Sequence, residues 1–189
     1  MTLTKPKATI EDLYEVDEKA EIVNGEIIRF MATGRLPGYA ADEVFVSLRQ
    51  YAKQQHDGSI AVGDNKAFYV RLPNRTSFSP DAAYYVGPNS GMKFYEGAPV
   101  FAVEVRSEND YGLTAEVDMA AKRRDYFAAG TQTVWDVDLL SEQGASVIRK
   151  YIAATGADTP AAIFARSEVA DALPALPGWA MPVDDLFEG

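Results

Sequence analysis

Two acidic residues and one lysine lie in segments that the sequence predicts to be neighbours. Asp81 stands near the start of a predicted strand over 79–86, and Glu104 interrupts the apolar run of a second predicted strand over 99–107. An ionised carboxylate is costly inside such a run unless it has a partner, so Glu104 predicts a nearby cation. Lys122 lies on the helix predicted directly after these strands and could place an ammonium group beside both carboxylates.

These residue types together suit the metal-dependent hydrolysis of a phosphodiester. That reaction needs a hard cation to neutralise the phosphoryl oxygens, a water molecule held in line and a group that orients or deprotonates this water. Mg²⁺ takes oxygen ligands and keeps several of its waters, so one or two carboxylates and a backbone carbonyl are enough protein ligands. The sequence therefore predicts Asp81, Glu104 and the Val105 carbonyl as ligands of Mg²⁺ or Mn²⁺, with Lys122 facing the attacking water.

Each of these residues also has an ordinary structural interpretation. Asp81 follows a proline and could cap backbone amides at a turn. Glu104 could form an ion pair with Arg106, which shares its face of the strand. Lys122 could pair with Asp118, which precedes it by four residues on the same helix.

The composition excludes several other chemistries. There is no cysteine, which removes disulfides, thiolate nucleophiles and cysteine-based zinc sites. The single histidine, His56, lies where a helix is predicted to end, so histidine-based catalysis is a poor candidate. The 189 residues are 47% hydrophobic, which predicts one globular domain over 1–189. No apolar core of signal-peptide length follows Met1–Lys7 and no run approaches a membrane span, so we expect a cytoplasmic protein with no membrane partner.

The net charge bears on the substrate. It is −10, and a field of that sign repels a polyanion such as DNA. A DNA-cleaving enzyme of this composition needs a locally basic groove, and bound divalent cations also change the local sign. The residues that would have to converge to form that groove are Arg71, Arg75, Arg106, Lys122, Arg123 and Arg124.

The order of predicted elements indicates an α/β or α+β domain with a mixed sheet. Asn24-Gly25 predicts an N-terminal β-hairpin, because both residues tolerate a positive φ. Gly130 closes the second long helix at the position where a left-handed residue is common. The predicted helices cover 9–14, 39–55 and 112–129, and the predicted strands cover 20–23, 26–31, 59–62, 67–72, 79–86, 99–107, 133–138, 145–151 and 161–165, followed by a last turn over 183–187.

The ordered motifs resemble the Uma-type restriction endonucleases, a family of the PD-(D/E)XK nuclease superfamily. The resemblance covers nearly the whole chain. It rests on Pro80-Asp81, Glu104-Val105-Arg106-Ser107, Asp118-x-x-x-Lys122-x-x-x-Tyr126-x-x-x-Gly130, Val134-Trp135-Asp136-Val137-Asp138, the Asn24-Gly25-Glu26 hairpin and Leu176-Pro177-Gly178-Trp179.

The resemblance implies a restriction-endonuclease-like fold, in which helices flank a central mixed sheet, and one divalent-metal site held by Asp81 and Glu104. The superfamily lysine normally follows the acid by two residues, but that position is Arg106 here, and arginine does not deprotonate. The resemblance therefore implies that Lys122 takes the role of the superfamily lysine. It also suggests a further acid, Glu43 or Glu26. Arg106, Asp118 and Tyr126 are additional candidates at the same site.

Three functions follow from these observations. The first is an Mg²⁺- or Mn²⁺-dependent DNA endonuclease, expected as a homodimer because cutting two strands favours two sites. The second is a catalytically silent, dimeric binding or regulatory module on the same scaffold, which the acidic balance and Arg106 favour. The third is a metallohydrolase of small phosphodiesters, which the net charge would suit.

Overall fold

The structure is a computed structural model that describes residues 6–188. The segment 1–5, on which the expectation of no signal peptide partly rests, lies outside the described residues. In the described part of the chain, no helix is both long enough and apolar enough to cross a membrane.

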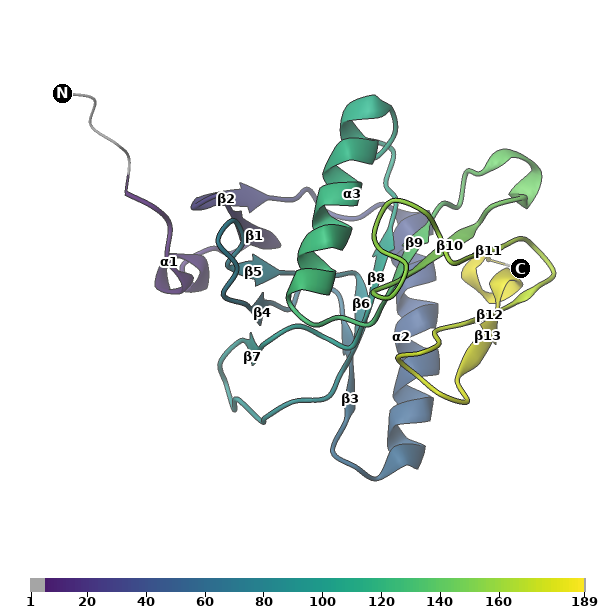
Figure 1. Cartoon of the computed structure of the whole chain (residues 1–189), viewed down its shortest axis with the longest axis horizontal. Coiled ribbons are helices and arrows are strands. Elements are labelled where there is room, and N and C mark those ends of the chain that lie inside the picture. Colours follow the sequence, from purple (N-terminus) through teal and green to yellow (C-terminus); the bar gives the residue numbers. More distant parts are fainter. Residues whose placement is uncertain (1–5, 189) are drawn as a thin grey trace.

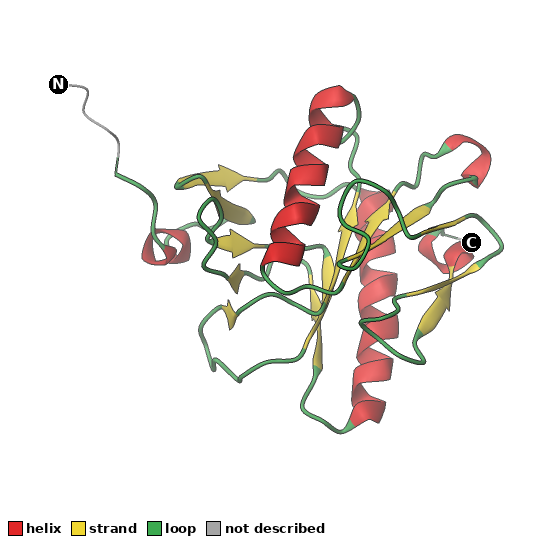
Figure 2. Ribbon diagram, in the orientation of Figure 1, coloured by secondary structure: helices red, strands yellow, loops and turns green. Residues whose placement is uncertain are grey.

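A mixed, six-stranded sheet forms the centre of the molecule (Figure 2). β8 and β9 run parallel to each other, and every other neighbouring pair in this sheet is antiparallel. This arrangement confirms the predicted mixed sheet. The strand order is β11-β10-β9-β8-β6-β3, with bounds β3 Ile60–Gly63, β6 Ala82–Tyr85, β8 Phe101–Val105, β9 Thr133–Val137, β10 Ile148–Ile152 and β11 Ala162–Phe164.

Two long helices cover opposite faces of this sheet. In Figure 1, α3 (Leu113–Ala128) lies in front of the sheet, and α2 (Arg35–Gln55) is fainter behind it. Val103 packs with the α2 side chains, whereas its neighbour Ala102 packs with Tyr126 of α3. Alternate residues of a strand point to opposite faces, so Glu104 is directed toward α3.

The N-terminal elements lie beside α3 and match most of the predictions. Thr9 caps α1 (Ile10–Tyr14), and Asn24-Gly25, with φ values of 52° and 78°, joins β1 (Ala20–Val23) to β2 (Glu26–Arg29). Tyr14, at the end of α1, is 45% exposed, and its ring stacks on Phe94 with ring centroids 3.9 Å apart.

The segment between β3 and β8 departs furthest from the predictions. Of the predicted strand over 67–72, only β4 (Phe68–Tyr69) forms a strand, and it lies outside the central sheet. It joins β5 (Ser77–Phe78) and β7 (Tyr95–Glu96) in a small separate sheet, and β7 lies in a segment predicted to be a loop. Phe68 and Phe78 are fully buried there, because the small sheet packs under the N-terminal hairpin and α3.

One helix boundary and one hairpin also differ from the predictions. α2 begins at Arg35, four residues before the predicted Tyr39, whereas its end at Gln55 matches the prediction, and His56 follows in a left-handed conformation with φ 54°. The sequence analysis missed a C-terminal hairpin that carries Trp179 into the core next to Trp135, at a centroid distance of 5.2 Å. The remaining elements are η1 Glu142–Gly144, β12 Val169–Asp171, β13 Ala180–Pro182 and η2 Val183–Leu186, of which η2 matches the predicted last turn.

Candidate active site

Asp81 and Glu104 are brought together by the pairing of β6 with β8. Asp81 directly precedes β6, and its backbone N–H donates to the Val103 carbonyl at 3.0 Å. Its side-chain Oδ2 accepts the Val105 N–H at 2.6 Å. The Asp81 carboxylate therefore lies at the level of Glu104 on the neighbouring strand.

Lys122 completes this group from α3. Its Nζ lies 2.8 Å from Glu104 Oε2, and the lysine side chain is only 16% exposed. Asp118, one turn earlier on the helix, is exposed. The interpretation of Lys122 as the partner of Asp118 on a solvated face is therefore wrong.

Tyr126, one turn further along α3, holds the other oxygen of Glu104. Its hydroxyl donates to Glu104 Oε1 at 2.6 Å, and its ring stacks on Phe78 at a centroid distance of 4.0 Å. Burial and the adjacent Glu104 carboxylate raise the pKa of Tyr126 well above its ordinary value, so the phenol stays a donor. Tyr126 thus serves both in the core and at the site.

Glu21 of β1 is a member of the site that the sequence analysis missed. It is 1% exposed, and its Oε1 lies 2.8 Å from Lys122 Nζ. Oε1 also accepts the Ser79 N–H at 2.8 Å, and Oε2 pairs with Arg75 Nη1 at 2.5 Å. Burial acts to raise the pKa of Glu21, but Lys122 and Arg75 outweigh it and hold that pKa below its ordinary value. A charged residue inside the apolar run of β1 was the available signal, the same one that identified Glu104.

Lys19 and Asp64 also belong to the site, and neither was predicted. Lys19, immediately before β1, places its Nζ 2.5 Å from Asp81 Oδ1 and 2.6 Å from Asp64 Oδ1. Burial acts to lower the pKa of Lys19, but Asp81 and Glu104 raise it above its ordinary value. Both residues lie just outside a strand, where charged side chains are usual, so the sequence carries no signal for them.

We call the connected group the Glu104 cluster. Arg75 links Glu21 to Asp125, because its Nε lies 2.8 Å from Asp125 Oδ2. The members are Lys19, Glu21, Asp64, Arg75, Asp81, Glu104, Lys122, Asp125 and Tyr126.

Burial and the neighbouring acids shift the pKa of Glu104. Burial raises the pKa of Glu104 to about 7, Lys122 opposes this shift, and Asp81 and Glu21 add to it. Near neutral pH the Glu104 carboxyl therefore lies close to the balance between its charged and neutral forms.

The further acids proposed from the sequence lie elsewhere. Glu26 is exposed on β2. Glu43 lies on α2, on the far side of the central sheet from α3. Neither residue joins the Glu104 cluster.

Arg106 belongs to a second buried group, which we call the Asp136 cluster. The Arg106 guanidinium binds both Asp136 oxygens, with Nε to Oδ1 and Nη2 to Oδ2 each at 2.8 Å. It also pairs with Glu116, and Arg123 Nη1 lies 3.2 Å from Asp136 Oδ2. The interpretation of Glu104 as the ionic partner of Arg106 is therefore wrong.

The basic residues expected to line a groove are instead distributed among separate ion pairs. Arg75 and Lys122 lie in the Glu104 cluster, and Arg106 and Arg123 lie in the Asp136 cluster. Arg124 pairs with Asp158 at 2.8 Å, and Arg71 lies over the Tyr69 ring at 4.6 Å. These six residues do not converge into one basic surface.

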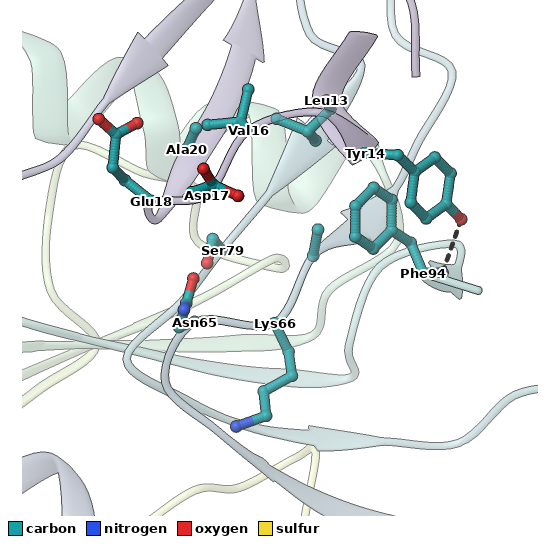
Figure 3. A pocket seen from close by; sticks show the side chains of 11 residues that line it. Leu13, Tyr14, Val16, Asp17, Glu18, Ala20, Asn65, Lys66, Ser79 and Phe94 are labelled. Atoms are coloured by element: carbon teal, nitrogen blue, oxygen red, sulfur yellow. Dashed lines mark hydrogen bonds between the residues drawn. The ribbon is translucent and has the colours of Figure 1, made fainter. Parts of the chain in front are cut away.

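A cavity of about 210 Å³ adjoins the Glu104 cluster (Figure 3). Five of its lining residues touch the cluster through the chain or a hydrogen bond. Glu18 and Ala20 flank Lys19, Asn65 follows Asp64, Lys66 donates to the Asp64 carbonyl, and the Ser79 N–H donates to Glu21. Tyr14 and Phe94 stack at its other end, where the Phe94 N–H donates to the Tyr14 hydroxyl at 2.9 Å. The site thus has open space on its N-terminal side.

The donor chemistry of the cluster fits a hard divalent cation that keeps several waters. Among residues 6–188, no three His, Cys, Asp or Glu side chains converge into a complete metal-binding group. Asp81 and Glu104 nevertheless offer carboxylate oxygens side by side, and a cationic group, the Lys19 ammonium, already binds Asp81. Two carboxylates suffice for Mg²⁺, because water fills its remaining positions.

Comparison with known proteins identifies the fold and the family. No protein of curated function matches the chain. A crystal structure described as that of a putative nuclease belonging to DUF820 from Anabaena variabilis ATCC 29413 aligns with 95% of this chain and 97% of its own, at a TM-score of 0.69 and 16% identity. This likeness confirms the restriction-endonuclease-like fold. The model of the Uma2 family, described as "Putative restriction endonuclease", matches residues 8–184, and the chain therefore belongs to the Uma2 family.

Proposed function

We propose that this protein is an endonuclease that hydrolyses DNA phosphodiester bonds with the help of Mg²⁺ or Mn²⁺. Membership of the Uma2 family supports a nuclease in general. The observation that carries the proposal is the meeting of Asp81, Glu104 and Lys122, which come from three separate elements.

Asp81 and Glu104 would hold the cation, with the Val105 carbonyl beside them. The cation, when bound, would neutralise phosphoryl oxygens and make a water molecule more acidic. Glu104 can serve as a ligand only in its ionised form, which its pKa of about 7 makes accessible near neutral pH.

Lys122 would act as a fixed positive charge and hydrogen-bond donor. Burial acts to lower the pKa of Lys122, but Glu104 and Glu21 outweigh it and raise that pKa above its ordinary value. An ammonium that holds its proton cannot take one from water, so its role is to orient the attacking water and stabilise negative charge in the transition state. Glu21 is then a positioning residue, because it fixes the Lys122 ammonium from the side opposite Glu104.

The ion pairing of the basic residues favours a second candidate, a hydrolase of small phosphodiesters. The six basic residues expected at a DNA groove are spread over separate contacts, and the net charge of −10 repels a long polyanion. A small substrate carries a single phosphodiester charge, so the negative charge of the protein repels it far less than it repels a long polyanion.

The test compares cleavage of supercoiled, linear and single-stranded DNA with hydrolysis of a chromogenic small phosphodiester, each with added Mg²⁺ or Mn²⁺. We expect the parent protein to nick DNA, Glu104→Gln to lose this activity, and Asp118→Asn, an exposed change on the same helix, to retain it. Hydrolysis of the small diester without DNA cleavage would establish the second candidate. If the parent and Glu104→Gln were equally inactive on all substrates, the chain would be a silent scaffold instead.

We also propose that the protein acts as a homodimer in the cytoplasm, since two-fold dimers are the commonest assembly and present two sites to two strands. Sedimentation equilibrium would test the assembly: a species of twice the 20.6 kDa chain mass is expected, and a monomer at working concentration would contradict it.

A further inference from the structure

The Lys19 ammonium binds one of the two oxygens through which Asp81 would hold a metal ion. Oδ2 of Asp81 accepts the Val105 N–H at 2.6 Å, and Oδ1 lies 2.5 Å from Lys19 Nζ. The Val105 N–H is part of the backbone of β8 and cannot move away. A metal ion that binds Oδ1 would meet the Lys19 ammonium at the same oxygen, and the two positive charges repel each other.

The charge balance of the cluster leaves room for such an ion. Within the described part of the chain, the cluster contains five carboxylates, on Glu21, Asp64, Asp81, Glu104 and Asp125, and three cationic groups, on Lys19, Arg75 and Lys122. With Glu104 ionised, the excess of two negative charges equals the charge of one divalent cation. Neutralising it would remove repulsion between carboxylates that the fold forces together.

Asp64 offers the Lys19 ammonium a second position. Its Oδ1 lies 2.6 Å from Lys19 Nζ, and its side chain is 34% exposed, compared with 11% for Asp81. Asp64 lies in the turn that follows β3, at the outer side of the cluster. A lysine side chain has four flexible methylene groups, so its ammonium can leave Asp81 while it stays paired with Asp64.

We propose that Lys19 is the gating residue of the metal site: its ammonium occupies Asp81 Oδ1 in the metal-free protein, and a divalent cation binds by displacing it onto Asp64. This inference rests on the proposed function, because it takes Asp81 as a metal ligand. Lys19 and the metal then compete for Asp81, and Asp64 favours the metal because it binds the displaced ammonium.

If Lys19 gates the site, substitutions of Lys19 and of its partner Asp64 should change the Mn²⁺ affinity in opposite directions. Lys19→Met removes the competitor, so the affinity for Mn²⁺ should rise by about tenfold or more. Asp64→Asn removes the position that receives the displaced ammonium, so the affinity should fall by about fivefold. Lys19→Arg should also weaken binding, because a guanidinium fork can hold two carboxylates more firmly than an ammonium.

The experiment is a calorimetric titration of each full-length variant with MnCl₂ at one pH and one ionic strength. Lys66→Met is the matched control: Lys66 is an exposed neighbour that binds the Asp64 backbone carbonyl at 2.9 Å, and its loss changes the net charge by the same amount as Lys19→Met. We expect its Mn²⁺ affinity to remain within about twofold of the parent. Circular dichroism of each variant checks that it is folded.

The outcomes separate the gate from the function on which it rests. If the parent binds Mn²⁺ and Asp81→Asn does not, but Lys19→Met binds as the parent does or more weakly, the gate is overturned and the metal site stands. If Lys66→Met raises the affinity as much as Lys19→Met, net charge explains the effect and the gate is overturned. If neither the parent nor Lys19→Met binds Mn²⁺, the metal-dependent function and the gate fall together.

Discussion

The Glu104 and Asp136 clusters begin at directly paired positions of the central sheet and yet differ in character. Glu104 and Asp136 are register partners on β8 and β9, and both side chains point toward α3. Asp136 meets two guanidinium groups, and the fork of Arg106 binds both of its oxygens. Glu104 meets one ammonium and one phenol, with Asp81 and Glu21 close enough to raise its pKa.

This difference shows that one face of a sheet can hold both a rigid, structural ion-pair cluster and a reactive site. The Asp136 cluster is balanced, since Asp136 and Glu116 face Arg106 and Arg123. A bidentate arginine pair of this kind is rigid and keeps its charge. The Glu104 cluster has surplus carboxylates, and such an arrangement favours the binding of a cation or a shift of protonation.

The largest expected effect separates two adjacent residues of α3. Lys122→Gln should reduce DNA cleavage by about 10²- to 10⁴-fold, because the charge beside the reacting water is lost. Arg123→Gln should leave the cleavage rate of folded protein within about tenfold and lower stability instead, because Arg123 binds Asp136 and the Ala157 carbonyl. Nicking rates and urea unfolding of both variants test this. Equal losses of activity would show that the two clusters act as one site.

The second prediction compares how substitutions of Asp136 and Glu104 change the free energy of unfolding. Asp136→Asn should lower the free energy of unfolding by about 3 to 5 kcal/mol, because it leaves two buried guanidinium groups without their carboxylate. Glu104→Gln should cost about 1 kcal/mol or less, because it removes one of several surplus acids and Lys122 keeps Glu21. Urea unfolding at neutral pH measures both. A larger loss for Glu104→Gln than for Asp136→Asn would contradict the contrast.

The pH dependence sharpens the contrast further. Burial raises the pKa of Glu104 from 4.5 to about 7. The folded protein therefore binds more protons than the unfolded chain between these values, so this group makes stability fall as the pH rises through that window, by about 3 kcal/mol at most. Glu104→Gln should flatten this slope, and urea unfolding from about pH 4.5 to about pH 7.5 measures it. An unchanged slope would mean that Glu104 titrates normally.

The last comparison concerns single hydroxyl groups. Tyr126→Phe should cost about 1 to 2 kcal/mol of stability, because it removes a buried hydrogen bond to a carboxylate. The matched change Tyr111→Phe removes a bond to Asp138 Oδ1 at 2.9 Å, but Tyr111 is 38% exposed and this oxygen still accepts the Leu140 N–H at 3.1 Å, so the cost should be smaller. Urea unfolding of the two variants gives the comparison. The reverse order would mean that the Tyr126 hydroxyl contributes little to the fold.

The sequence led to part of the site through one physical signal, a charge inside an apolar strand. That signal predicts Glu104 and is equally present at Glu21, whereas Glu26 and Glu43 rest only on the family resemblance. Lys19 and Asp64 carry no such signal, because charged residues outside strands and helices are ordinary. The long helices and most strands were predicted, whereas the exit of β4 from the central sheet and the C-terminal hairpin were not, because short segments obtain their strand structure from tertiary packing.

The amino-acid sequence alone determined the two long helices, the N-terminal hairpin, most strands of the central sheet and the direction in which the side chains of β8 point. Turn chemistry at Asn24-Gly25 and Gly130 and the two-residue period of β8 are local properties, so they can be read without a partner. Only the tertiary structure decided which cation meets which carboxylate. Lys19 and Asp81 are separated by 62 positions and Arg75 and Glu21 by 54, and both contacts exist only because the N-terminal hairpin folds against the sheet beside α3.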